Sequence, residues 1–197
     1  MIQSGFTIEN PITGSRTVLI EGDAETGGSG WLLESHTVPH AAPDVPEHFH
    51  TAWSEEFEIL SGQAHYSLDG VEQTAGPGDR FVVGPGQRHI HPWNGGDTEM
   101  VYRQRDNFNG PDAGAVQDVL GVFATIAELA RQGKVNAQGR VKNPLQQAVM
   151  LKVLNRHGGY DASIPRRMQD VLAVTLGSIG ELAGYRAIDP AFGNQEQ

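Results

Sequence analysis

The feature that most constrains this 197-residue chain is a change of hydrophobic period near residue 108. Before it, short segments alternate apolar and polar residues and are separated by turns, a pattern typical of β-strands. After the segment "NFNGPDAG", apolar residues recur at helical spacing. The sequence therefore predicts a mainly β fold, a small sandwich or barrel over residues 1–108, followed by an α-helical extension over residues 109–197.

The β part contains several expected strands joined by turns. Asp69-Gly70 predicts a tight hairpin, because glycine tolerates the positive φ that such turns require. The abundance of glycine and proline, 25 and 11 residues, also fits an antiparallel fold with many turns. The expected strands are RTVLIEG, GWLLESHTV, EEFEILSG, QAHYSLDG, DRFVVGPG and EMVYRQRD.

The α-helical extension is expected to contain three amphipathic helices. The first covers about 116–130, and the second begins at Asn143-Pro144, a capping residue before a proline, and ends near His157. Helices of this length are marginal alone, so they should pack on each other, on the sheet or on a second subunit. The third runs from about Pro165 with the apolar stripe Met168, Val171, Leu172, Leu176 and Ile179.

Composition excludes several function classes. The formal net charge of −10 argues against nucleic-acid binding, since such a chain repels phosphate backbones. The absence of cysteine excludes disulfides and thiolate ligands. The start of the chain lacks the basic and apolar parts of a signal peptide, and no run approaches the roughly 18 apolar residues of a membrane span. We expect a cytoplasmic protein without a membrane or nucleic-acid partner.

Histidines and an acid crowd into "PEHFHTAWSEEFEILSG". His48 and His50 are two residues apart, so in a strand they project from the same face. Glu55 shares its parity with Phe57 and Ile59, which predicts that Glu55 faces the interior. An unpaired carboxylate there would be costly, and a metal ion would remove that cost.

Further imidazoles come from "GDRFVVGPGQRHIHPWN", in which His89 and His91 share a face. Three imidazoles and one carboxylate suit Fe(II), Mn(II), Ni(II), Cu(II) or Zn(II), and they leave coordination positions open for water, substrate or oxygen. The residues alone do not choose among these metals.

The two segments together resemble the paired motifs of the cupin superfamily. His48, His50, Glu55 and Gly62 match the first motif, and Gly78, Pro85-Gly86 and His89 match the second. The likeness covers roughly residues 40–105. Ala42 replaces the first motif's leading glycine, and the second motif's proline and closing asparagine, Asn94, each fall one position late.

The resemblance implies a cupin, jelly-roll-like β-barrel whose metal ligands are His48, His50, Glu55 and His89. It also favours Fe(II) and a non-haem oxygenase of dioxygenase type acting on a small organic substrate, in a homodimer completed by the helices. Two alternatives stay open because the fold does not dictate the reaction. They are metal-assisted isomerase, lyase or cyclase chemistry, and a non-enzymatic protein that binds a small ligand.

Four other residues are candidates for the pocket. His91 is expected to act as a proton shuttle or to hydrogen-bond within the barrel. Tyr102 is a candidate base, and Gln104 shares its face and is expected to reach the substrate. Trp93 follows His91 in parity, which predicts that it walls the ligand cavity or caps the barrel end.

Overall fold

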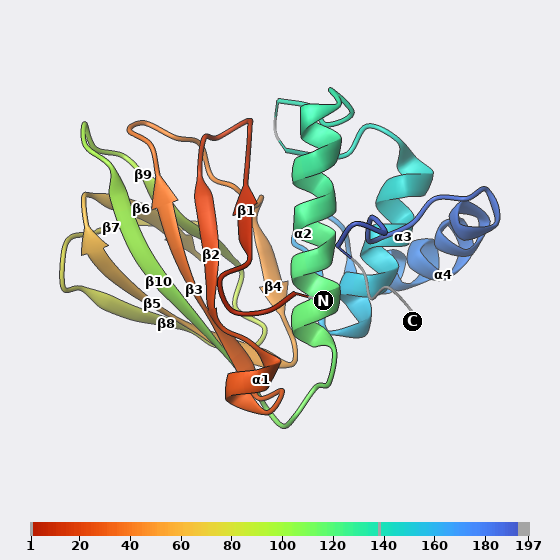
Figure 1. Ribbon diagram of the computed structural model, residues 1–197, viewed down its shortest axis with the longest axis horizontal. Helices are drawn as coiled ribbons and strands as arrows, with labels where there is room; N and C mark the ends of the chain where they lie inside the picture. The colour runs from red at the N-terminus through yellow and green to blue at the C-terminus, as the bar shows by residue number, and fades with distance from the viewer. Residues whose placement is uncertain (1, 138, 193–197) are drawn as a thin grey trace.

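The computed structural model describes residues 2–137 and 139–192 of the chain. It contains two antiparallel sheets that face each other, with a helical layer beside them (Figure 1). The predicted mainly β fold, a jelly-roll-like barrel with a helical C-terminal part, is confirmed. In the described residues, no helix combines the length and apolarity that crossing a membrane requires.

The first sheet has six strands, and every strand predicted in the β part forms in one of the two sheets. A short helix, α1 (Asp23–Thr26), lies between β2 and β3. In spatial order the strands are β1 (Thr7–Glu9), β2 (Arg16–Glu21), β3 (Gly30–Thr37), β10 (Met100–Phe108), β5 (Trp53–Ser61) and β8 (Arg80–Val83).

The second sheet has five strands. Its hairpin between β6 and β7 turns at Asp69 and Gly70, whose φ angles of 49° and 78° confirm the predicted tight turn. In spatial order the strands are β11 (Gly159–Asp161), β4 (His48–His50), β9 (His89–Asn94), β6 (Ala64–Leu68) and β7 (Val71–Ala75).

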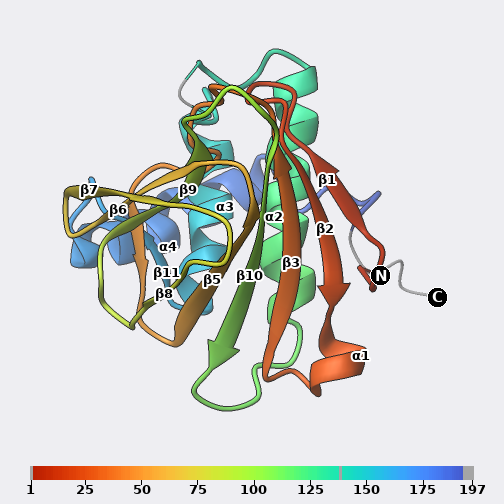
Figure 2. The ribbon, with the colours of Figure 1, turned by 90° about the vertical axis from the view of Figure 1, so that its left-hand side faces the viewer.

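The helical layer contains α2 (Ala115–Arg131), α3 (Pro144–Arg156) and α4 (Arg166–Leu182), close to the three predicted helices. The side chain of Asn143 accepts hydrogen bonds from the backbone of Leu145 and Gln146, the N-cap that the sequence predicts. Figures 1 and 2 show α2 nearest the sheets and α4 on the outer side of α3.

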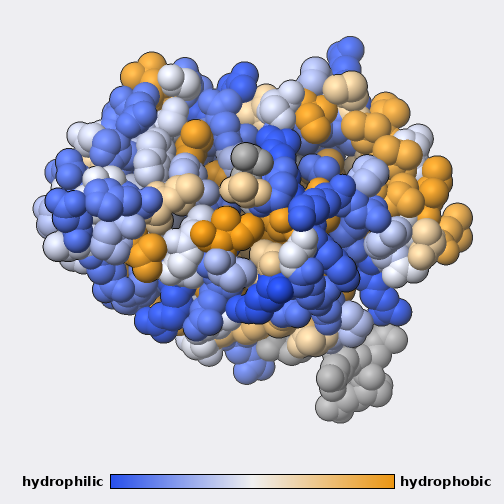
Figure 3. Space-filling model, turned by 90° about the horizontal axis from the view of Figure 1, so that it is seen from above, coloured by the Kyte–Doolittle hydropathy of each residue, from blue (hydrophilic) through white to orange (hydrophobic). Residues whose placement is uncertain are grey.

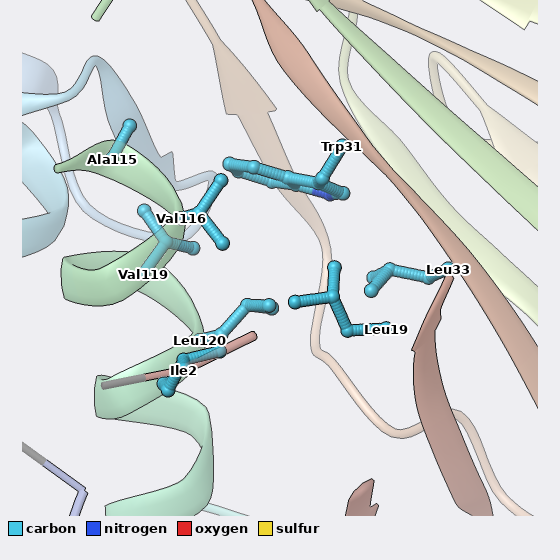
Figure 4. Close-up of a cluster of buried hydrophobic side chains, with 8 residues drawn as sticks. All are labelled: Ile2, Leu19, Trp31, Leu33, Ala115, Val116, Val119 and Leu120. Atoms are coloured by element: carbon cyan, nitrogen blue, oxygen red, sulfur yellow. The ribbon is translucent and has the colours of Figure 1, made fainter. Parts of the chain in front are cut away.

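The inner face of the six-stranded sheet has two covers. Around β5, the side chains of Phe57 and Ile59 pack against the second sheet. Around β2 and β3, Leu19 and Trp31 pack instead against Val116 of α2 and its neighbours (Figure 4). The cross-strand register places Trp31 beside Asp106 and Asp106 beside Glu55. Glu55 therefore lies at the boundary between the part of this sheet that packs on the second sheet and the part that packs on α2.

Strand β11 was not predicted, and it ties the helical layer to the barrel. It pairs with β4, so that Gly159 lies opposite His50 and Asp161 opposite His48. The ring of Tyr160 stacks on Phe49 with centroids 5.4 Å apart. The division into units 1–108 and 109–197 stays a prediction, since a strand from the second segment completes a sheet of the first.

Candidate metal centre

Three strands bring the predicted donor residues together. His48 and His50 come from β4, Glu55 from β5, and His89 and His91 from β9. Strands β4 and β9 pair at His48 and His89, which sets these two imidazoles side by side. The alternation of β5 buries Glu55 to 1% exposure and leaves Glu56 and Glu58 facing outward, as its parity predicts.

The donor atoms converge on the carboxylate of Glu55. Its Oε2 lies 2.8 Å from His89 Nε2 and 3.3 Å from His91 Nε2, and its Oε1 lies 3.7 Å from His50 Nε2. His48 Nε2 is 3.2 Å from His91 Nε2. One ligand atom from each of His48, Glu55, His89 and His91 fits within 4.8 Å of the others, so this group could hold a metal ion.

Backbone carbonyls fix the orientation of two imidazoles. His48 Nδ1 lies 2.8 Å from the carbonyl oxygen of Pro46, and His89 Nδ1 lies 3.0 Å from that of Gln87. A carbonyl only accepts hydrogen bonds, so each Nδ1 carries the proton and donates it. The Nε2 atoms, which face Glu55 and His91, are left as the coordinating nitrogens.

Burial and mutual repulsion set the protonation of the cluster. Burial lowers the pKa of His50 to about 3, and burial together with the neighbouring His91 lowers the pKa of His48 well below its ordinary value. Burial alone would raise the pKa of Glu55, but His50 and His91 hold it well below its usual range. Burial lowers the pKa of His89, yet the contact with Glu55 outweighs it and raises that pKa. Neutral His48 and His50 and an ionised carboxylate are the forms that bind metal ions.

The donor set fits a transition-metal ion. Glu55 Oε2 and His89 Nε2 are completely enclosed, and neither makes a well-aligned hydrogen bond within the described part of the chain, although they are 2.8 Å apart. Two ligands at about 2.1 Å from one ion and at right angles to each other are about 3.0 Å apart, close to the spacings here. A cation would satisfy both atoms, and imidazole with carboxylate suits Fe, Mn, Ni, Cu or Zn.

A buried amide supports the carboxylate from behind. Gln104 Nε2 donates to Glu55 Oε1 at 3.0 Å and to Asp106 Oδ1 at 2.9 Å. Burial, and then the charge of Glu55, raises the pKa of Asp106 well above its usual value. The sequence analysis did not predict Asp106 as a site residue. Its parity with Tyr102 and Gln104 on β10 could have identified it, because parity with buried neighbours also predicted the inward direction of Glu55.

The cluster opens onto a cavity of about 250 Å³, which is lined by strands of both sheets and by helices α2 and α3. His48, His50, Glu55 and His91 line one side of it. The helix side is mainly apolar. It contains Val119, Leu120, Phe123, Ile126, Met150, Leu151 and Leu154, together with the polar Gln147. Because open coordination positions require access, a donor group on a cavity wall suits a reactive metal site better than a closed structural one.

Of the four other predicted pocket residues, three line the cavity and one does not. His91, Tyr102 and Gln104 line the cavity. Burial raises the pKa of Tyr102 far above its ordinary value, so its phenol stays protonated. Trp93 is not among the described residues that line the cavity, and its ring packs near His65 with centroids 5.8 Å apart. A bulge between β6 and β9 breaks the alternation after His91, so the parity argument for Trp93 fails.

The ligand role of His50 remains a prediction. Its ring stacks on Trp53, with centroids 4.1 Å apart, and its Nε2 is farther from Glu55 than those of His89 and His91. His91, predicted as a pocket residue, belongs to the tighter group. The structure thus offers two imidazoles, His50 and His91, for one position of a three-histidine set.

Comparison with known families agrees with this arrangement. Residues 35–102, which carry all five donor residues, match the model of the cupin domain family. The chain contains a cupin domain. No curated protein matches the sequence significantly.

Several solved structures resemble the cupin domain at low sequence identity. A predicted oxalate decarboxylase from Thermotoga maritima is 17% identical, with a TM-score of 0.46 over 55% of this chain and 99% of that one. The cupin domain of Cnp3 from Schizosaccharomyces pombe is 13% identical, with a TM-score of 0.43 over 60% and 71%. A sugar phosphate isomerase from Silicibacter pomeroyi is 18% identical, with a TM-score of 0.41 over 49% and 60%. At these values the likenesses carry no conclusion about activity.

Proposed function

We propose that this cupin is a metal-dependent enzyme, a non-haem oxygenase of dioxygenase type that acts on a small organic substrate. The observation that carries the proposal is the opening of an imidazole–carboxylate donor group onto a mainly apolar cavity. A volume of about 250 Å³ is at the low end for ligand pockets, which supports a small substrate.

The proposed ligands are Glu55, His48 and His89, with His50 or His91 as the third imidazole. A bound metal such as Fe(II), or Mn, Ni, Cu or Zn, would supply open positions that bring substrate oxygen atoms and dioxygen together. Gln104 holds the carboxylate of Glu55 in place through its 3.0 Å hydrogen bond.

The chain's other residues orient the substrate and exclude water. The protonated phenol of Tyr102 can donate a hydrogen bond to an oxygen atom in the cavity. On the opposite side, the apolar side chains of Phe123, Met150 and Leu154 disfavour water beside them. The substrate that fits this arrangement has a compact apolar body with its oxygen atoms at one end.

Elemental analysis and oxygen uptake test the proposal together. Freshly purified protein should contain close to one transition-metal ion per chain, and His89→Ala should lose it. With a panel of small aromatic and aliphatic compounds that carry adjacent oxygen atoms, the metal-loaded protein should consume dioxygen. Metal-free protein as purified, with no gain on adding Fe(II), Mn(II), Ni(II), Cu(II) or Zn(II), would end the proposal.

A second candidate is metal-assisted isomerase, lyase or cyclase chemistry without dioxygen. It is favoured by the position of His91 on the cavity wall, 3.3 Å from Glu55, where an imidazole that is not a ligand can accept a proton from substrate. Conversion of a compound with no oxygen uptake would select this alternative. Tight binding of a ligand with no conversion would select a non-enzymatic binding protein.

A further inference from the structure

Helix α4 has two faces of different chemistry. The inward face, toward α3, consists of small residues and one buried amide: Gln169, Ala173, Gly177 and Gly180. The opposite face carries the large apolar side chains. Their exposed fractions are 49% for Met168, 60% for Val171, 64% for Val174, 52% for Ile179 and 91% for Leu182.

Close approach of the two helices explains the inward face. A Cβ atom added at Gly180 would lie 2.6 Å from a methyl group of Val149 and 2.9 Å from the carbonyl oxygen of Leu145. One added at Gly177 would lie 3.1 Å from the carbonyl oxygen of Ala148. Large side chains have no room against α3, so most of the predicted apolar stripe of this helix lies outside.

An apolar outer face on the outermost helix needs a partner. Such a row of large side chains costs free energy while it is in contact with water, and patches of this kind mark interaction sites. Seen from above, hydrophobic residues gather at the end of the molecule where α3 and α4 lie (Figure 3).

Four of the five exposed residues, all except Val174, are spaced symmetrically about Thr175. Val171 and Ile179 lie four residues before and after it, and Met168 and Leu182 lie seven residues before and after it. An antiparallel copy of the helix, related by a two-fold axis at Thr175, would therefore place Met168 opposite Leu182 and Val171 opposite Ile179. A two-fold interface requires this self-complementarity.

The charges at the helix ends point to the same arrangement. The first turn of α4 carries Arg166 and Arg167 and no acid, whereas the last turn carries no base and one acid, Glu181, which pairs with Lys152 of α3 at 2.7 Å. This is the reverse of what the helix dipole favours within one helix. In an antiparallel pair, each basic end lies beside the acidic, carbonyl-rich end of the other helix.

We infer that α4 is a homodimer interface, in which it packs antiparallel against α4 of a second copy about a two-fold axis at Thr175. The symmetric apolar row supplies the buried surface, and Arg167 of each copy approaches the C-terminal end of the other helix. The sequence predicts a homodimer, and this inference assigns its surface.

Light scattering after size exclusion tests the interface. The wild-type protein should have twice the chain mass, and Val171→Glu should convert it to a monomer by at least a tenfold increase in the dimer dissociation constant. Val71→Glu is a matched control, because Val71 on β7 is 61% exposed. A monomeric wild type, or a dimer that survives Val171→Glu, overturns the inference, as does an equal loss of the dimer in Val71→Glu.

A single cysteine tests the register. Facing residues of antiparallel helices about 8–10 Å apart can bring their Cα atoms within disulfide distance. The chain has no cysteine, so Thr175→Cys introduces one thiol per copy. Mild oxidation should join most of this variant into a covalent dimer, while Thr74→Cys, at an exposed position on β7, should remain mainly unlinked. Equal crosslinking of the two variants contradicts the proposed axis.

Discussion

The two walls of the cavity differ in both chemistry and construction. The sheet wall presents His48, His50, Glu55 and His91 from hydrogen-bonded strands, whereas the helix wall presents mainly aliphatic and aromatic side chains. A metal site needs donors held within a few tenths of an ångström, which strands supply, and apolar contacts tolerate more variation. The difference indicates that metal binding and the choice of substrate can be altered separately, except where β11 joins the walls.

The largest expected effect is a loss of bound metal when the charge of Glu55, on the sheet wall, is removed. Glu55→Gln keeps the shape but removes the only carboxylate of the donor group, so metal content should fall by about tenfold or more. Glu56→Gln is the matched control, since the neighbouring Glu56 faces outward with a side chain 41% exposed. Elemental analysis of both variants, with circular dichroism to verify folding, gives the comparison. Equal metal content in the two would show that Glu55 is not a ligand.

The next largest effect is expected on stability and metal affinity, from a substitution at Gly158, which lies where β11 connects the helix wall to the sheet wall. Its φ of 88° is unfavourable for alanine, and an added Cβ would lie 2.7 Å from Thr51 Oγ1, beside the β4–β11 pairing. Gly184 has the same φ, 87°, but no atom within 4 Å of such a Cβ. Each alanine variant should lose about 1–2 kcal/mol of unfolding free energy from its backbone strain.

Gly158→Ala should cost about 1–3 kcal/mol more than Gly184→Ala, because of the added clash. It should also weaken metal binding, since it displaces the strand that carries His48 and His50. Urea unfolding and a metal competition assay measure the two effects. If both variants retain wild-type metal affinity, then the pairing of β11 with β4 does not hold His48 and His50 in position for the metal.

Local patterns explain how much of the site the sequence could predict. The direction of Glu55 follows from its parity with Phe57 and Ile59, two residues that must be buried wherever the strand lies. The same rule fails at Trp93, because a bulge in β9 shifts the alternation; Pro92, a residue type that sheets tolerate at bulges, is the local signal for it. Strand β11 was missed because its partner β4 is more than a hundred residues away in the chain.

The face of a helix is harder to predict than its existence. The spacing of Met168, Val171 and Ile179 is that of a core-facing stripe, and it predicts the helix itself correctly. The face of α4 that meets α3 depends on how closely the two backbones approach. Gly177 and Gly180 allow the close approach, because neither has a side chain that would contact α3. The spacing rule takes large apolar residues as the core-facing ones, whereas in α4 small residues and Gln169 are buried.

A smaller effect concerns the helix wall and its dependence on pH. His157, at the end of α3, lies 2.9 Å from Asp118 of α2 and 2.9 Å from Asp112. The hydrogen bond with Asp118 outweighs burial and raises the pKa of His157, while Arg156 also faces Asp118 at 3.6 Å. The resulting stabilisation is complete below the ordinary histidine pKa near 6.5, and it is lost as the pH rises through the higher pKa of the folded state.

His157→Gln should therefore be less stable than the wild type by about 2 kcal/mol at pH 5.5, and the difference should shrink by pH 9. Urea unfolding at both pH values measures it, and comparison with the wild type cancels the titration of other groups. A difference that is constant or grows with pH would mean that the imidazole is neutral in the folded protein. Metal content should be unchanged, since this contact belongs to the helix wall.

The smallest effect is expected outside both walls, at Trp93. Its ring is half-buried near His65, so Trp93→Ala should cost about 1 kcal/mol or less and leave metal content and turnover as in the wild type. Trp53 is the contrasting residue, because it is buried, lines the cavity and stacks on His50, and Trp53→Ala should cost about 3–5 kcal/mol and weaken the metal site. Unfolding curves and elemental analysis of the two variants decide the matter. Loss of turnover in Trp93→Ala with the metal retained would show that Trp93 contributes to the cavity despite the bulge in β9.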